Sequence, residues 1–277
     1  GVFNISDNTR WYDSFATRFS DILPATNLNN SNTGKKINVK DFFPKINGGS
    51  SIYSNGGVQR TFRITSLGTI SISGNPYETF KWENSVFSNS KMAFHFYERS
   101  GTYYLKRSDY ESGYYFSGVD EYTLYDENNL CIFMEANKTI GSYLSRTCKN
   151  AFTGNPPIYN DTYHFTNFVK EELLTVPYGT YSTKKFVFAL WDNSLYPSIT
   201  APYLMHVVFW VNNEVGIVQY RDHLGRIWKL VSADTDGDGQ DNKTDNDDDN
   251  DGVLDSIDAF KLDPDASIDS NSDGIPD

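Results

Sequence analysis

The hydrophobic pattern of the chain is that of short β-strands, in which segments rich in aromatic and β-branched residues alternate with clusters of Gly, Asn, Asp and Ser. The alternation is clearest where Met92, Phe94 and Phe96 fall on one face of an extended segment and His95 and Tyr97 fall on the other. This period of two is typical of antiparallel strands with one buried face. The pattern predicts strands over residues 58–65, 67–73, 77–82, 91–98, 102–107, 113–118, 130–136, 139–146, 184–191, 204–212, 215–221 and 226–232.

The last three predicted strands should form an antiparallel meander, because residues 212–214 (Asn-Asn-Glu) and 222–225 (Asp-His-Leu-Gly) provide the two turns between them. Residues 186–191 and 204–211 are apolar on both faces, so strands there are expected at the centre of a sheet. The body of the protein is therefore predicted to be all-β, either an antiparallel sandwich or an open barrel.

A single short helix is expected near the N-terminus, over residues 10–23. Trp11, Phe15, Phe19 and Ile22 follow the spacing i, i+4, i+8 and i+11, which places them on one helical face, and a proline follows the segment. We expect this helix to pack on the sheet.

Composition divides the chain into a β-rich body, residues 1–231, and a tail, residues 232–277. Within the body, residues 150–161 (NAFTGNPPIYND) are the clearest internal break, and they could be a long loop or a boundary between two β subdomains. No apolar run of about 18 residues is present, so no membrane-spanning segment is predicted.

The acidic charge of the protein is concentrated in the tail. From Asp234 to Asp277 the chain holds 16 Asp and two Lys, a local net charge of −14, whereas the whole chain carries −12. The remaining residues are therefore nearly neutral at +2, which argues against a nucleic-acid partner. Carboxylates packed this densely would repel one another and leave the tail unfolded without counter-ions.

The aspartates of the tail repeat in register on a 12-residue loop of the type that binds Ca²⁺. Two complete loops begin at Asp234 and Asp247, and a third begins at Asp269. Oxygens at positions 1, 3, 5, 9 and 12 and a carbonyl at position 7 would supply the roughly six to eight ligands that Ca²⁺ prefers, and Gly at position 6 permits the sharp turn. The predicted ligands are Asp234, Asp236, Asp238, Gln240, Asn242, Asp245, Asp247, Asp249, Asp251, Val253, Asp255, Asp258, Asp269, Asn271, Asp273, Ile275 and Asp277.

The spacing of the loops distinguishes them from other calcium motifs. Successive loops begin 13 and then 22 residues apart, and the shorter interval leaves only Asn246 between two loops, so the helices of an EF-hand or a dockerin do not fit. The alternating spacing and the linker at residues 259–264 (AFKLDP) resemble thrombospondin type 3 repeats, in the form common in secreted proteins of Gram-negative bacteria. The resemblance covers residues 234–277.

The resemblance implies a tail that wraps around two or more Ca²⁺ ions with little regular secondary structure and acts as a stalk between domains of a secreted or cell-surface bacterial protein. It implies that the Asp residues at the loop positions are ligands, whereas Asp241 and Asp248, outside those positions, are expected to matter less than Asp251. Asn242 departs from the family by replacing Asp, and the Cys pairs of the animal repeats are absent. Because the third loop stops before position 12, we expect further domains beyond residue 277.

Cys131 and Cys148 are the only cysteines of the chain. Calcium loops of this type saturate outside the cytosol, where two thiols normally pair, so we predict a Cys131–Cys148 disulfide. It would close a loop of 17 residues and stabilise the fold by on the order of 3 kcal/mol through chain entropy.

Aromatic residues make up 16% of the chain and include 19 Tyr, against roughly 8–9% in an average composition. Such side chains can cover sheet faces as cross-strand pairs, or they can contact sugar rings and protein partners. Both interpretations remain open for the densest group, whose candidate ligand-binding members are Tyr103, Tyr104, Tyr110, Tyr114 and Tyr115.

The body offers no catalytic signature. Its four His show no metal spacing, and no HExxH, GxSxG or catalytic-cysteine motif is present. Residues 176–181 (VPYGTY) and 209–220 (FWVNNEVGIVQY) resemble a pattern of secreted bacterial β domains, which share no single activity, so the resemblance implies only a β fold.

The leading hypothesis is a secreted or cell-surface binding or adhesion module on a calcium-stabilised stalk, with a glycan or a surface protein as its ligand. One alternative is a structural subunit of a matrix or filament. Another is a polysaccharide-active enzyme, whose paired carboxylates would be recognisable only in space.

Overall fold

A computed structural model of the protein describes residues 36–37, 42, 46–84, 93–109, 131–134, 138–139, 143–152, 158–192, 203–222 and 225–277. These residues form fourteen β-strands and no α-helix, which confirms the all-β prediction for the body. No described segment is a helix with the length and apolar character needed to cross a membrane. The predicted helix over residues 10–23 and the predicted strand over residues 113–118 lie outside the described residues.

Twelve of the strands form one antiparallel sheet, and β1 (Lys36–Ile37) pairs separately with β8 (Lys138–Thr139). The strands of the large sheet are β2 (Ser50–Asn55), β3 (Val58–Ile72), β4 (Asn75–Asn84), β5 (Ala93–Arg99), β6 (Thr102–Asp109), β7 (Cys131–Met134), β9 (Tyr143–Phe152), β10 (Ile158–Val176), β11 (Gly179–Asp192), β12 (Tyr203–Asn212), β13 (Gly216–Arg221) and β14 (Ile227–Asp234).

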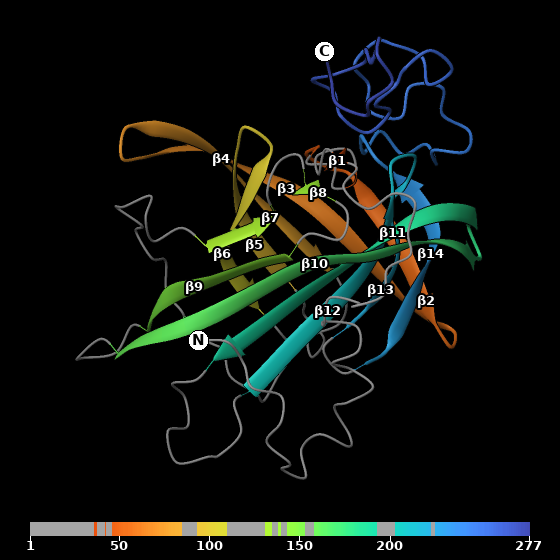
Figure 1. Cartoon of the computed structure of the whole chain (residues 1–277). Helices are drawn as coiled ribbons and strands as arrows, with labels where there is room; N and C mark the ends of the chain where they lie inside the picture. The colour runs from red at the N-terminus through yellow and green to blue at the C-terminus, as the bar shows by residue number, and fades with distance from the viewer. Residues whose placement is uncertain are drawn as a thin grey trace.

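The order in space is β7-β6-β5-β4-β3-β2-β14-β13-β12-β11-β10-β9, so two meanders are joined where β2 pairs with β14. The edge strand β7 also contacts β9 and β10 from the opposite edge. A twisted sheet of this many strands tends to curl, and here it curls until its two edges approach each other, the open-barrel arrangement (Figure 1). The predicted meander of the last three strands is confirmed as β12, β13 and β14.

Two strands depart from the sequence pattern because of bulges. The predicted strands at 58–65 and 67–73 are one strand, β3, since a register shift between Ser66 and Gly68 carries the chain past a glycine with φ of 85°. The 19-residue strand β10 was not predicted, because its polar and aromatic residues show no clear period and a bulge between Phe168 and Glu171 shifts its register.

Strand β2 was also not predicted, and it is the strand that joins the two meanders. The candidate break at residues 150–161 falls in the hairpin of β9 and β10, where residues 150–152 and 158–160 pair with one another. The division of the chain into a body and a tail stays a prediction.

Aromatic side chains from both meanders form the main core cluster. Tyr220 of β13 packs edge-on against Tyr53 and Phe62, with ring centroids 5.1 and 5.3 Å apart. Trp82 of β4 lies 4.7 Å from Phe62 and 5.6 Å from Phe209. Burying each such side chain stabilises the fold by roughly 1.5–3 kcal/mol, so the cluster holds together the two halves that meet at β2 and β14.

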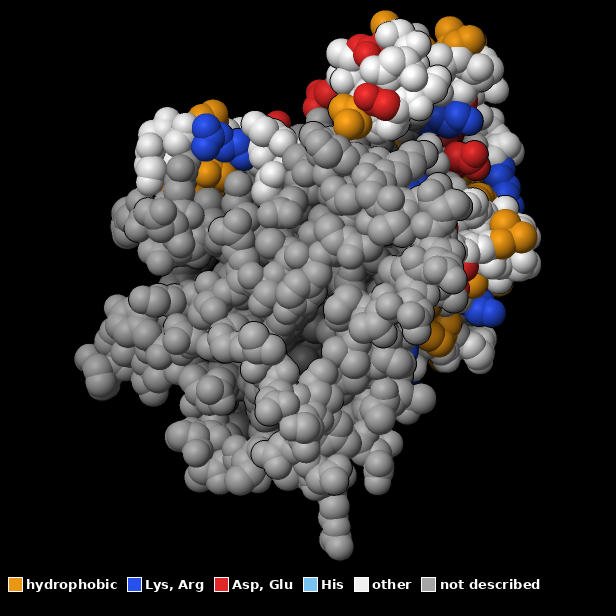
Figure 2. Space-filling view, in the orientation of Figure 1, with side chains coloured by type: hydrophobic (Ala, Val, Ile, Leu, Met, Phe, Trp, Pro, Cys, Tyr) orange, Lys and Arg blue, Asp and Glu red, His pale blue; other side chains and the backbone are white. Residues whose placement is uncertain are grey.

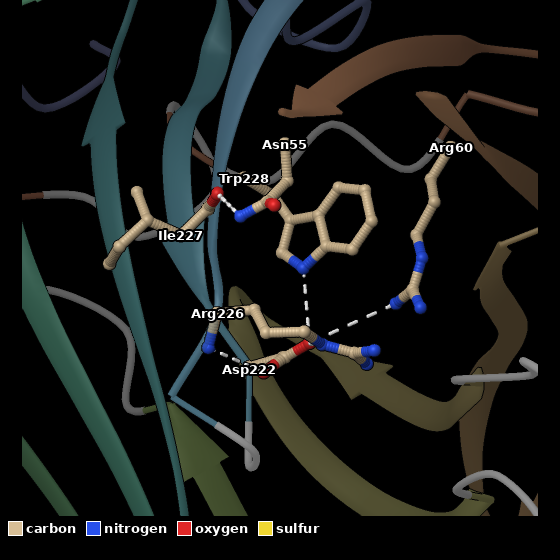
Figure 3. Close-up of polar contacts among 6 residues, drawn as sticks. All are labelled: Asn55, Arg60, Asp222, Arg226, Ile227 and Trp228. Carbon is tan, nitrogen blue, oxygen red and sulfur yellow. Dashed lines mark hydrogen bonds and ion pairs between the residues drawn. The ribbon is translucent and has the colours of Figure 1, made fainter. Parts of the chain in front are cut away.

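A buried carboxylate ties the end of β13 to β14 and β3 (Figure 3). Asp222, only 1% exposed, accepts hydrogen bonds from the Trp228 indole at 3.0 Å and from the Arg226 side chain at 2.6 Å. The buried Arg60 guanidinium lies 3.9 Å from the same carboxylate and stacks 4.0 Å above the Trp228 ring. Nearby, the Asn55 amide donates to the carbonyl of Ile227 at 2.6 Å. The predicted turn at residues 222–225 is thus anchored by its first residue.

Candidate metal centre

The first predicted calcium loop begins inside the sheet, because Asp234 is the last residue of β14 and pairs with Ser50 of β2. In the first two loops, the carboxylates of positions 1, 3 and 5 converge, with one oxygen of each lying within 4.8 Å of the others. In the first loop this group consists of Asp234, Asp236 and Asp238. In the second loop it consists of Asp247, Asp249 and Asp251. Three oxygens at this separation can contact one cation.

Local side-chain to backbone hydrogen bonds hold these carboxylates in place, as is typical of Asp and Asn in turns. In every loop the side chain at position 3 accepts a bond from the amide of position 5, and the side chain at position 5 accepts one from the amide of position 7. The position-3 bonds measure 3.0, 3.2 and 2.9 Å for Asp236, Asp249 and Asn271. The position-5 bonds measure 2.7, 2.6 and 2.9 Å for Asp238, Asp251 and Asp273.

Glycine at position 6 has the conformation that the repeat predicts. Gly239, Gly252 and Gly274 have φ of 98°, 91° and 78°, a region that residues with a Cβ rarely adopt. In the second and third loops the amide of this glycine donates to the carboxylate at position 1, at 3.1 Å to Asp247 and 2.9 Å to Asp269.

Position 9 closes each loop onto its beginning. Its backbone amide donates to the carbonyl of the residue that precedes position 1, at 2.9, 2.9 and 3.2 Å in the three loops. Its side chain accepts a bond from the amide of position 2, at 2.9, 3.0 and 2.6 Å for Asn242, Asp255 and Asp277. An amide oxygen can accept this bond as a carboxylate does, so Asn242, which stands where the family has Asp, makes the same closing bond.

The second loop contains buried oxygens that no group in the described part of the chain satisfies. Asp249 and Asp258 are 3% and 7% exposed, and one oxygen of each is buried without a hydrogen-bond partner among the described residues, as is one oxygen of Asp247. Burial raises the pKa of Asp249 to about 7, and the carboxylates of neighbouring aspartates add to the rise. Buried carboxylates are normally paired or bound to a metal, so positions 1, 3 and 12 of this loop fit a cation.

The other predicted ligands do not belong to either of these two groups of converging carboxylates. Asp245, at position 12 of the first loop, accepts bonds from the amides of Asn246 and Asp247 at 2.7 and 3.2 Å. The carbonyl ligands proposed at position 7, which are Gln240, Val253 and Ile275, remain predictions.

Asp241, which lies outside the predicted ligand positions, attaches the tail to the body. Its carboxylate accepts hydrogen bonds from the hydroxyls of Tyr178 and Ser232 at 2.6 and 2.7 Å. Burial alone would raise its pKa, but these bonds hold the pKa of Asp241 below its ordinary value. The Lys243 ammonium lies 3.9 Å from the centre of the Tyr178 ring, a cation–π contact across the same junction. Nothing in the loop register could have predicted a role for position 8.

Backbone packing adds a second attachment of the first loop to the body. A Cβ on Gly49 would lie 2.3 Å from the Thr235 carbonyl oxygen, and a Cβ on Gly237 would lie 2.5 Å from the carbonyl carbon of Gly48. The chain before β2 and the first loop therefore approach more closely than any side chain would allow. The remainder of the tail extends away from the sheet, with acidic and apolar side chains on its surface (Figures 1 and 2).

The predicted disulfide and the predicted tyrosine-lined site involve side chains that the structure does not describe. Cys131 lies in β7 and Cys148 in β9, the two edge strands that contact each other, but their side chains are not among those described. The same holds for Tyr103 and Tyr104 of β6, whereas Tyr110, Tyr114 and Tyr115 lie outside the described residues altogether. The disulfide and the tyrosine-lined binding site stay predictions.

Comparison with known proteins does not assign a family. No family model matches the chain, and no curated protein matches it. A protein described as a lipoprotein from Parabacteroides distasonis is similar in structure, with a TM-score of 0.36 and 14% identity over 74% of this chain and 100% of that one. An exported protein with a YmcC-like fold from Bacteroides fragilis has a TM-score of 0.31 and 10% identity over 69% and 98%. Similarities this low assign neither a function nor a cellular location.

Proposed function

We propose that residues 234–277 bind Ca²⁺ through type 3-like loops and that calcium gives this segment its defined structure. The observation that carries the proposal is the second loop, where converging carboxylates at positions 1, 3 and 5 accompany buried oxygens for which the described residues offer no hydrogen-bond partner. A cation would satisfy these oxygens, and the ligand set contains only oxygen atoms, which favours a hard ion such as Ca²⁺.

The apolar content of the tail supports the same proposal. Of the large apolar side chains in residues 235–277, only Phe260 and Leu262 are buried, whereas Leu254, Ile257 and Ile268 are more than half exposed. Ordering the backbone of a single residue costs about 1–2 kcal/mol. Two buried side chains cannot offset that cost over the whole segment, so another source of stability is required.

We infer from this that the protein works outside the cytosol, as a secreted or cell-surface β module. Loops of this kind in extracellular modules bind Ca²⁺ at roughly 0.1–1 mM, a concentration that is available outside cells. The contacts of Asp241 and Gly237 with the body would make the calcium-ordered segment a stiff extension of the sheet. Such an arrangement suits a binding or adhesion module, and the high tyrosine content favours a glycan or a surface protein as its ligand.

Calorimetric titration of the calcium-free chain with CaCl₂ tests the calcium proposal. We expect at least two ions per chain, and Asp251→Asn should remove one of them because it deletes a carboxylate at position 5. Asp265→Asn removes the same charge from an exposed position outside the loops and should leave the number of ions unchanged. Equal losses in both variants would mean that diffuse charge, not defined sites, attracts the ions. A wild-type chain that binds no calcium would overturn the proposal.

The binding role is tested separately, with calcium-saturated protein and a panel of immobilised polysaccharides. Retention of the full chain by one class of polysaccharide, released by the soluble sugar, would support a glycan ligand. Release of shorter sugars from the panel would instead indicate an enzyme, and concentration-dependent assembly without retention would indicate a structural subunit.

A further inference from the structure

The first loop is built directly onto the strand pair that joins the two meanders. Asp234 is both the last residue of β14, paired with Ser50 of β2, and a member of the converging carboxylate group of the loop. The residue before it, Ala233, pairs with Ser51 and is buried in the main core cluster. The carbonyl of Ala233 accepts the amide of Asn242 that closes the loop, at 2.9 Å. Residues of the loop and residues of the core are therefore direct neighbours in the chain.

Thr235, at position 2 of the first loop, connects the closing residue of the loop to the chain before β2. It is only 6% exposed, and its amide donates to the Asn242 side chain at 2.9 Å while its hydroxyl accepts a bond from the same side chain at 2.8 Å. The Thr235 carbonyl oxygen would lie 2.3 Å from a Cβ on Gly49, so only glycine permits this approach. A displacement of Thr235 would therefore remove the contact that holds Gly49.

The chain before β2 is in turn bonded to β3. The Gly48 amide donates to the carbonyl of Ile64 at 3.0 Å, and the Ile64 amide donates to the carbonyl of Gly49 at 2.9 Å. The side chain of Asn47 accepts a bond from the amide of Ser66 at 3.0 Å. Because Ile64 packs against the main core cluster, contacts run from the first loop through these residues into the core.

Like charges in the loop supply the reason why its occupancy would matter to the sheet. The carboxylates of Asp234, Asp236 and Asp238 lie within 4.8 Å of one another and repel each other when no cation compensates them. The repulsion favours opening of the loop. Because Asp234 is also a strand residue and Thr235 packs on Gly49, the loop cannot open without loosening the end of the β2–β14 pair.

We propose that calcium binding in the first loop orders the joint between the two meanders, residues 47–51 and 232–234, as well as the tail. The inference rests on the proposed calcium binding of the tail and adds that this binding also acts on the body. Calcium outside the cell would then stiffen the pairing of β2 with β14, the place where the two halves of the large sheet meet.

Coupling between two sites is reciprocal, so a change at the joint should weaken calcium binding. Gly49 lacks the positive φ of Gly48, and Gly49→Ala therefore displaces Thr235 without straining the backbone. We expect calorimetric titration of this variant to show one calcium site weakened by about tenfold or more. Asn55→Ala is the matched control, because it removes a bond to the Ile227 carbonyl at the opposite end of the same strand pair. Its calcium affinity should equal that of wild type, and equal losses in both variants would overturn the inference.

Hydrogen–deuterium exchange of the full wild-type chain provides a measurement that does not depend on how a variant folds. We expect the amides of Gly48 and Ile64, which bond across the joint, to exchange about tenfold faster or more in EDTA than in calcium. If EDTA removes protection from residues 235–277 and leaves these two amides unchanged, the coupling is wrong while the calcium proposal stands. If EDTA changes neither region, the calcium proposal itself fails.

A pair of variants at the same position of two loops assigns the effect to the first loop. At a calcium concentration that just saturates wild type, Asp238→Asn should show the faster exchange at Gly48 and Ile64. Asp251→Asn, which is the same change at position 5 of the second loop, should match wild type at these amides. Equal effects of the two variants would contradict a specific link from the first loop to the joint.

Discussion

At the scale of single residues, the loop register predicted which side chains converge but not what each one does. Glycine at position 6 has the positive φ that the motif predicts, and the carboxylates of positions 1, 3 and 5 converge in the first two loops, because both features are properties of local sequence. The role of these carboxylates as calcium ligands stays a prediction. Position 9 was predicted only as a ligand, yet its oxygen accepts a backbone bond that closes the loop. Asp241 instead bonds Tyr178 and Ser232, which lie outside the loop and which no spacing rule contains.

Removal of the side chain at position 9 should open the first loop. Asn242 accepts a bond from the Thr235 amide and donates one to the Thr235 hydroxyl, at 2.9 and 2.8 Å. Asn242→Ala would leave a partly buried amide unsatisfied, at a cost of about 1–3 kcal/mol, and should weaken the calcium affinity of that loop by about tenfold or more. Asn242→Asp keeps the acceptor and should retain the affinity. Calorimetric titration measures both, and equal affinities for wild type and Asn242→Ala would contradict the closing role.

At the scale of strands and turns, hydrophobic alternation found the regular strands and missed the irregular ones. Residues 208–211 of β12 and residues 216–220 of β13 are buried on both faces and mostly apolar, so their pattern is strong. The long strand β10 mixes polar and aromatic residues, and a bulge between Phe168 and Glu171 shifts its register against β11. The pairing of β2 with β14 joins segments far apart in sequence, and local patterns carry no information on such a pairing.

Asp222 is expected to be the most sensitive polar residue of the sheet. Asp222→Asn keeps the shape of the side chain but removes the charge beside the buried Arg60 guanidinium. Disrupting one partner of a buried ion pair typically costs about 3–5 kcal/mol, and urea denaturation should show this loss of stability. Arg226→Gln serves as the matched control, because its side chain is 36% exposed and solvent screens its ion pair with Asp222. A loss below that of Arg226→Gln would contradict this account of the network.

The junction between the tail and the sheet depends on the Tyr178 hydroxyl. Tyr178→Phe removes its hydrogen bond to Asp241, which is a bond to a charged group and contributes about 1.5–3 kcal/mol. In saturating calcium, cleavage by an added protease near residues 232–245 should become faster by about tenfold or more. Tyr181→Phe removes a neighbouring hydroxyl that makes no described hydrogen bond, and its cleavage rate should match wild type. Identical rates for all three chains would show that the bond does not hold the tail.

At the scale of the whole molecule, the sequence predicted the all-β class and an open barrel as one of two architectures, but not which strands would meet at the two edges. The curl follows from the contact of β7 with β9 and β10, which brings the two edges together. The predicted partners Cys131 and Cys148 lie on these two edge strands. A disulfide between them would therefore close the seam of the sheet.

Peptide mapping without reductant tests that closure. We expect a peptide containing Cys131 linked to one containing Cys148 in oxidised protein. The double variant Cys131→Ser, Cys148→Ser should lower the stability to urea by on the order of 3 kcal/mol, the chain-entropy value for a loop of this length. Free thiols in protein purified without reductant would contradict the prediction.

Hydrogen–deuterium exchange with and without calcium tests the central claim most directly, that cations and not an apolar core order residues 235–277. With calcium bound, the amides that close the loops, such as those of Asn242 and Asp255, should be protected. After addition of EDTA, peptides from residue 235 onward should exchange at unfolded rates, and renewed excess calcium should restore their protection, while β12 and β13 stay protected throughout. Protection of the tail that persists unchanged in EDTA would contradict the account.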